Sequence, residues 1–139
     1  MSEAPLPRQV YISGIGVLDR FEHERVEWPD IAAGETYALS LRRDRVLYVG
    51  DPGLAPGYHP GGLAVTDVTD GYRVLDVTGP TALDLLRRGA ELRLDRPSRS
   101  VMRRVFGIDI LLYRRGGELS FRLHIPRAHA QALATHLRA

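Results

Sequence analysis

Four carboxylates gathered in one short segment are the first candidates for acid–base chemistry. The segment VTDVTDGYRVLDVTGPTALDLL, residues 65–86, holds Asp67, Asp70, Asp76 and Asp84. Two carboxyl groups can act as general acid and base when one is buried beside the other. The Asp70-Gly71 pair, however, has the composition of a tight turn, and Asp84 falls on the polar side of an expected helix. The segment therefore predicts no catalytic pair.

The five histidines would bind a metal only if several of them met at one point. His129 and His136 are seven residues apart, so on one helix they would lie two turns from each other and could not share an ion without further ligands. His124 is expected on the preceding strand, and the other two in loops. The sequence has no HxxxH or HExxH pair and no Cys, so it predicts no metal site and no disulfide.

Other motifs of cofactor binding and covalent catalysis are incomplete. Gly14-Ile15-Gly16 lacks the third glycine and the following helix of a dinucleotide fingerprint, and instead indicates a bulge or a tight crossing of strands. No serine lies in a G-x-S-x-G elbow, and the absence of Lys and Cys removes Schiff-base and thiolate chemistry. We therefore expect this chain to contribute no catalytic, cofactor-binding or metal-binding residue.

The basic residues are unusual in kind, because all 19 are arginine. A guanidinium binds carboxylates and phosphates through two parallel hydrogen bonds, and Arg73, Arg122 and Arg127 could hold an anionic ligand in this way. The 17 acids nearly balance the charge, and the arginine pairs are scattered without interleaved aromatics. That distribution is not typical of a nucleic-acid-binding protein. We favour a biased amino-acid composition as the reason that all the basic residues are arginine.

Length and composition indicate a single globular domain. The chain has 139 residues, of which 44% are hydrophobic, and this is enough for one core. No run of 18 apolar residues is present, and the N-terminus lacks the apolar region of a secretory signal. We expect a cytoplasmic protein that contacts neither membranes nor nucleic acid.

The first half of the chain is expected to supply strands and one long loop. Residues 1–8 should form a flexible tail, and the N-terminal strands should lie within residues 9–50, with Arg42-Arg43-Asp44 as a hairpin turn. Residues 51–63 contain so many Pro and Gly residues that we expect no regular element there.

Residues 64–139 are predicted to form the core unit, with the element order β-β-α-β-β-β-α. Asp70-Gly71 should close a hairpin between the first two strands. Gly79-Pro80 should start a helix with leucines along one face, and Gly89 should take the left-handed conformation just past its end. Later strands and a helix after Pro126 complete the pattern. This order predicts an α+β fold in which helices pack on an antiparallel sheet.

Two segments resemble the gamma subunit of heterotetrameric sarcosine oxidase. They are VTDVTDGYRVLDVTGPTALDLLRRGAELRLD and LLYRRGGELSFRLHIPRAHAQALATHL, which together extend from about Ala64 to Leu137. That subunit belongs to the broader fold class of the glycine-cleavage T-protein, the folate-binding domain of aminomethyltransferases. The resemblance therefore implies this fold and a place in a hetero-oligomer with larger flavoprotein subunits.

The resemblance does not extend to the catalytic site of the aminomethyltransferases. Those enzymes place a catalytic Asp shortly after an Asn-containing turn, and the corresponding segment here, residues 124–130, contains neither residue. The resemblance instead implies that FAD, with FMN, NAD and tetrahydrofolate as further candidates, is held by the partner subunits.

Two hypotheses follow from the sequence. The first is a non-catalytic accessory subunit of a flavin-dependent oxidase or dehydrogenase of sarcosine-like N-methyl or secondary amino acids, with Trp28 and Tyr58 as candidate partner contacts because aromatics are enriched in interface cores. The alternative is a stand-alone module that binds folate or an anionic amino acid. Under either hypothesis Asp70, Gly71, Gly79, Pro80 and Gly89 are expected to be structural residues.

Overall fold

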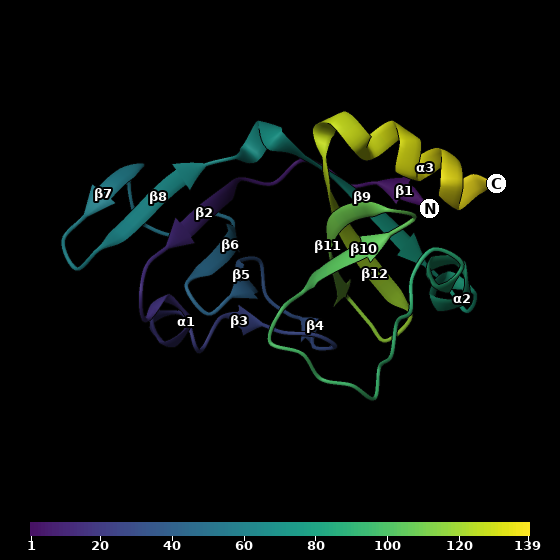
Figure 1. The fold of residues 1–139 in the computed structure, drawn as a ribbon, viewed down its shortest axis with the longest axis horizontal. Coiled ribbons are helices and arrows are strands. Elements are labelled where there is room, and N and C mark those ends of the chain that lie inside the picture. Colours follow the sequence, from purple (N-terminus) through teal and green to yellow (C-terminus); the bar gives the residue numbers. More distant parts are fainter.

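The strands form two six-stranded sheets that stack face to face, with helices on the two outer faces (Figure 1). The structure is a computed structural model and describes all of residues 1–139. Sheet A has the order β1-β9-β12-β11-β10, and β4 also pairs with β11. Its strands are β1 (Ser2–Glu3), β4 (Ile31–Ala32), β9 (Tyr72–Thr78), β10 (Met102–Val105), β11 (Ile108–Arg115) and β12 (Ser120–Pro126).

Sheet B has the order β3-β5-β6-β2-β8-β7. Its strands are β2 (Gln9–Ser13), β3 (Arg25–Val26), β5 (Tyr37–Arg42), β6 (Arg45–Val49), β7 (Gly57–His59) and β8 (Leu63–Asp67). The β5–β6 hairpin turns where the sequence predicts it. The predicted α+β class is confirmed, whereas the prediction of a single antiparallel sheet is wrong, because β3–β5 and β4–β11 are parallel pairs in two separate sheets.

The predicted hairpin at Asp70-Gly71 does not form. β8 pairs with β2 and β7 in sheet B, whereas the next strand, β9, pairs with β12 and β1 in sheet A. Between them the 3-10 turn η1 (Thr69–Gly71) redirects the chain, held by the Gly71 N–H on the Val68 carbonyl and by the Thr69 N–H on the Asp67 carboxylate. An Asp-Gly pair indicates a local change in the direction of the chain, and here that change leads from sheet B to sheet A.

Two further segments are more ordered than the sequence predicts. Ser2 and Glu3, expected in a flexible tail, pair with Asp76 and Leu75 at the edge of sheet A. Within the Pro/Gly-rich stretch 51–63, β7 pairs with β8, so that loop contains a strand. In both cases a neighbouring strand supplies hydrogen-bond partners that the local sequence does not reveal.

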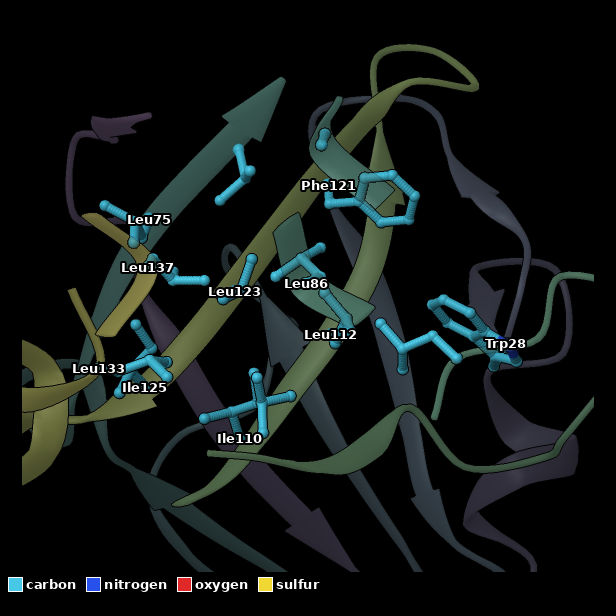
Figure 2. Close-up of a cluster of buried hydrophobic side chains, with 14 residues drawn as sticks. Trp28, Leu75, Leu86, Ile110, Leu112, Phe121, Leu123, Ile125, Leu133 and Leu137 are labelled. Carbon is cyan, nitrogen blue, oxygen red and sulfur yellow. The ribbon is translucent and has the colours of Figure 1, made fainter. Parts of the chain in front are cut away.

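Three helices cover the outer faces of the sheets. α1 (Val17–Arg20) lies against sheet B, and α2 (Ala82–Arg87) and α3 (Ala130–Arg138) lie against sheet A, with η2 (Arg127–His129) leading into α3. Leu86, Leu133 and Leu137 pack on the sheet residues Leu123 and Phe121 in one apolar cluster (Figure 2). Burying each leucine stabilises the fold by about 1.5–3 kcal/mol before entropy is counted.

The start of α2 agrees with its sequence signal, and its end does not. Gly79 has φ +109°, a conformation that favours glycine, and the helix begins at Ala82, just after Pro80. Gly89 is not left-handed. A Cβ at Gly89 would instead lie 2.5 Å from the Phe106 ring, so glycine is needed there for close packing.

No helix here has both the length and the apolar character needed to span a bilayer.

Candidate functional site

A chain of buried polar side chains crosses the space between the two sheets. His124 of β12 lies 2.5 Å through Nδ1 from Oε1 of Gln9 on β2, and its Nε2 lies 2.7 Å from the Tyr113 hydroxyl. The Tyr113 hydroxyl in turn lies 2.5 Å from that of Tyr37 on β5. All four side chains are almost fully buried. This network joins the two sheets through buried polar side chains.

The direction of each hydrogen bond follows from the donors and acceptors present. Gln9 donates through Nε2 to the Thr69 carbonyl, so its Oε1 accepts from Nδ1–H of His124. Nε2 of the neutral imidazole then accepts from the Tyr113 hydroxyl, and the Tyr113 oxygen accepts from Tyr37. Burial, assisted by the nearby Arg122 charge, lowers the pKa of His124 to about 3, so the histidine is neutral.

The sequence analysis missed this network. The alternation of apolar and polar residues along β12 shows that the strand has a polar face, but it does not show whether water or another sheet covers that face. In LSFRLHI the apolar residues Phe121, Leu123 and Ile125 face the helices, and His124 shares the other face with Arg122. A polar face of this kind normally faces water. Here sheet B covers the polar face of β12, and no nearby residue in the sequence indicates that a second sheet is present.

Arg122, one of the three arginines considered for anion binding, already has a carboxylate partner. Its Nε and Nη2 lie 2.8 and 3.0 Å from the two oxygens of Asp76 on β9. This bidentate pair raises the pKa of Arg122 further above its usual value. Arg73 points to the helix side of sheet A, the face opposite Arg122, and Arg127 is exposed in η2. The structure therefore does not bring the three arginines together around one ligand.

Trp28 is not available as a partner contact. Its side chain is 2% exposed and belongs to the core cluster beside α2. The indole N–H donates to the Arg93 carbonyl at 2.8 Å, and the Arg103 guanidinium lies 5.2 Å from the ring centroid. The expectation that Trp28 faces a partner is therefore wrong, because the indole fills this chain's own core.

Tyr58 is exposed and lies near a second exposed apolar residue. Tyr58 on β7 is 94% exposed and Ile15 is 97% exposed. Their loops adjoin, because a Cβ at Gly14 would lie 2.7 Å from the Gly62 carbonyl oxygen. The β7–β8 hairpin projects from the left of the molecule in Figure 1, away from α2 and α3. We call this surface, formed by residues 14–16 and 57–62, the distal end.

The structure contains no group of three His, Asp or Glu side chains placed to hold a metal ion. The four carboxylates of residues 65–86 do not form a catalytic pair either. Asp76 is paired with Arg122, and Asp67 accepts a hydrogen bond from the Thr69 N–H that lowers its pKa. Asp70 lies in the η1 turn and Asp84 in the first turn of α2.

Comparison with known proteins finds the same fold in a sarcosine oxidase. No protein-family model and no curated protein sequence matches the chain. A chain of the heterotetrameric sarcosine oxidase from Corynebacterium sp. U-96, solved in complex with pyrrole 2-carboxylate, superposes with a TM-score of 0.75 at 20% sequence identity. The match covers 98% of this chain and 80% of that chain. The likeness that the sequence motifs suggest is thus confirmed for the fold, over nearly the whole chain.

Proposed function

We propose that this chain is a non-catalytic accessory subunit of a heteromeric, flavin-dependent oxidase or dehydrogenase of sarcosine-like amines. The observation that carries the proposal is the fold shared with a chain of a heterotetrameric sarcosine oxidase over 98% of the residues. The motifs in residues 64–137 favour the gamma subunit as the counterpart and the aminomethyltransferase folate-binding domain as the wider fold class. The assembly is proposed to be cytoplasmic, without membrane or nucleic-acid partners.

The arrangement of polar side chains supports a structural role. His124 is the strongest candidate base by residue type, but it is fully buried, neutral and hydrogen-bonded on both ring nitrogens. Arg122 and Asp76 neutralise each other. Groups that are paired within the chain stabilise the contact between its sheets, and both ring nitrogens of His124 are already hydrogen-bonded and so are not free for a substrate. FAD and any FMN, NAD or tetrahydrofolate are then proposed to belong to the partners.

The distal end is the proposed partner contact. The proposal is supported by Ile15 and Tyr58, the two most exposed large apolar side chains of the chain, which lie together at this end. A specific interface of this kind buries about 1,200–2,000 Å² in total. Tyr58 would supply a rigid aromatic anchor, and the β7–β8 hairpin that carries it projects from the rest of the molecule (Figure 1).

Co-purification tests the proposal directly. The full chain carrying an affinity tag is co-expressed with flavoprotein oxidase subunits from the same source, and the eluate is passed over a sizing column with absorbance recorded at flavin wavelengths. We expect one peak that contains this chain and a yellow partner in fixed ratio. A stable monomer that elutes without flavin in the presence of those subunits would refute the proposal.

A further inference from the structure

A cavity of about 280 Å³ opens where the inter-sheet layer meets the β5–β6 hairpin. Its polar lining comes from Tyr11, Arg42, Arg45, Tyr72 and Asp109, and apolar residues including Leu111 complete the wall. Ligand cavities commonly start near 300 Å³, so this one suits a small molecule rather than a nucleotide or a folate.

Arg45 is the most unusual residue of this cavity. Its Nε is shielded from solvent and has no hydrogen-bond partner, one of only two such buried side-chain atoms in the structure. No carboxylate lies within ion-pair distance of Arg45, and its guanidinium is held 5.4 Å from the centroid of the Tyr11 ring. Arg45 therefore brings to the cavity wall a guanidinium without a carboxylate partner, and an anion that enters the cavity could pair with it.

The neighbouring groups do not neutralise Arg45. Burial outweighs the two arginine charges and raises the pKa of Tyr11, so its hydroxyl remains protonated. Tyr11 and Tyr72 share one hydrogen bond between their hydroxyls, which leaves one hydroxyl hydrogen free to donate. Asp109 is 79% exposed and lies 4.0 Å from Arg104, and Arg42 approaches only Asp44, at 3.9 Å.

We propose that this cavity binds a small monocarboxylate with an apolar or aromatic body, held by the Arg45 guanidinium. A carboxylate has only acceptors, and the cavity wall offers it donors from the guanidinium groups of Arg45 and Arg42 and from one tyrosine hydroxyl, against a single exposed carboxylate, Asp109. The apolar body would lie against Leu111 and the other apolar residues of the wall. The carboxylate is either that of a free acid or that of an acidic side chain of another protein. This inference does not depend on the proposed accessory role.

Titration of the full chain with sodium benzoate, followed by two-dimensional amide NMR, tests the proposal. We expect saturable shifts at residues around Tyr11, Arg45 and Leu111, with benzamide binding at least about tenfold more weakly because it lacks the charge. The absence of saturable shifts up to about 50 mM benzoate, far above a weak millimolar affinity, or equal binding of benzamide, would overturn the proposal.

Two variants in the same hairpin separate a specific site from general positive charge. Arg45→Gln should weaken benzoate binding about tenfold or more, whereas Arg43→Gln, which removes the same charge from an exposed position outside the cavity, should change it less than about twofold. Equal losses in both variants would contradict the assignment. The benzoate and benzamide comparison on the unmodified chain decides the matter if Arg45→Gln fails to fold.

A capped tripeptide, acetyl-Gly-Glu-Gly-amide, identifies the source of the carboxylate. If it displaces benzoate from the unmodified chain, the cavity receives an acidic side chain of another protein. If benzoate binds and the peptide does not, the ligand is a free small acid. Both results support a carboxylate site, and failure of both probes to bind refutes it.

Discussion

His124 Nδ1 and Gln9 Oε1 lie 2.5 Å apart although 115 residues separate them in the sequence. The two residues belong to different sheets, so this hydrogen bond and its continuation through Tyr113 and Tyr37 fix how the sheets face each other. Burying His124 also makes the stability of the fold sensitive to acid.

The first prediction concerns that acid sensitivity. The pKa of His124 is about 3 in the folded chain and about 6.5 when unfolded, so between these values the unfolded state binds one proton more. The free energy of unfolding should therefore be constant for this group above pH 6.5 and fall by about 1.4 kcal/mol per pH unit as the pH drops toward 3.

Urea denaturation at several pH values between 4 and 7.5 measures this dependence. Carboxylates titrate in part of the same range, so the decisive quantity is the difference from His124→Gln, which should lack the histidine's share of the slope. His129→Gln, at an exposed position, serves as the control and should retain the full slope. An unchanged slope in His124→Gln would show that the buried histidine does not set the acid sensitivity.

The second prediction concerns the Arg122–Asp76 pair. Both side chains are about four-fifths buried, at 21% and 23% exposure, so Asp76→Asn would leave a guanidinium charge without its partner between the sheets. We expect a loss of about 1–3 kcal/mol in the free energy of unfolding. Asp95→Asn breaks an equally short pair with Arg93 at the surface, where solvent screens the charges, and should cost much less. Equal losses would mean that burial does not strengthen the inner pair.

The third prediction concerns close packing at Gly89. A methyl group there would lie 2.5–2.7 Å from three Phe106 ring atoms, and the ring is stacked on His136 at a centroid distance of 4.9 Å. Gly89→Ala should therefore destabilise the fold by about 1–3 kcal/mol. The double variant with Phe106→Leu should recover part of this loss, since the smaller side chain relieves the contact.

A matched glycine provides the control for that experiment. Gly117 has open space around its Cα, and its φ is not in the left-handed region. Gly117→Ala should thus change the melting temperature by no more than about 2 °C. A comparable loss in both variants would attribute the effect to glycine replacement in general rather than to the Phe106 ring.

The fourth prediction concerns the distal end. Tyr58→Ser should leave the melting temperature of the isolated chain nearly unchanged, because the ring makes little contact with its own fold. If the chain joins a larger oxidase, the same variant should weaken that association at least about tenfold, measured by co-elution at decreasing concentration. Leu119→Ser, at another exposed apolar position away from the distal end, should leave association unchanged.

Local signals in the sequence predict several elements well. The leucine spacing of α3, the turn between β5 and β6 and the start of α2 after Pro80 all depend on residues close in sequence. The motifs in residues 64–137 likewise indicate the fold that the structural comparison finds.

Features that depend on distant residues could not be predicted in this way. Asp70-Gly71 gives the same signal whether the next strand returns beside β8 or passes to the other sheet. Gln9 and His124 acquire their roles only once two sheets enclose them, and Arg45 only once distant strands form the cavity that it lines. The position of a polar residue in a strand shows which face of the sheet it lies on, but it does not show what packs against that face.

The chain passes between the sheets more than once, since β1 and β4 lie in sheet A and are separated in sequence by β2 and β3 of sheet B. Neither sheet is therefore the product of one continuous stretch, and the fragment from residue 64 onward would lose two strands of sheet A while exposing the tyrosines and histidine behind it. Heating should melt the molecule in a single calorimetric transition, and a protease nick at Thr69–Gly71 should yield two pieces that stay associated until they denature together.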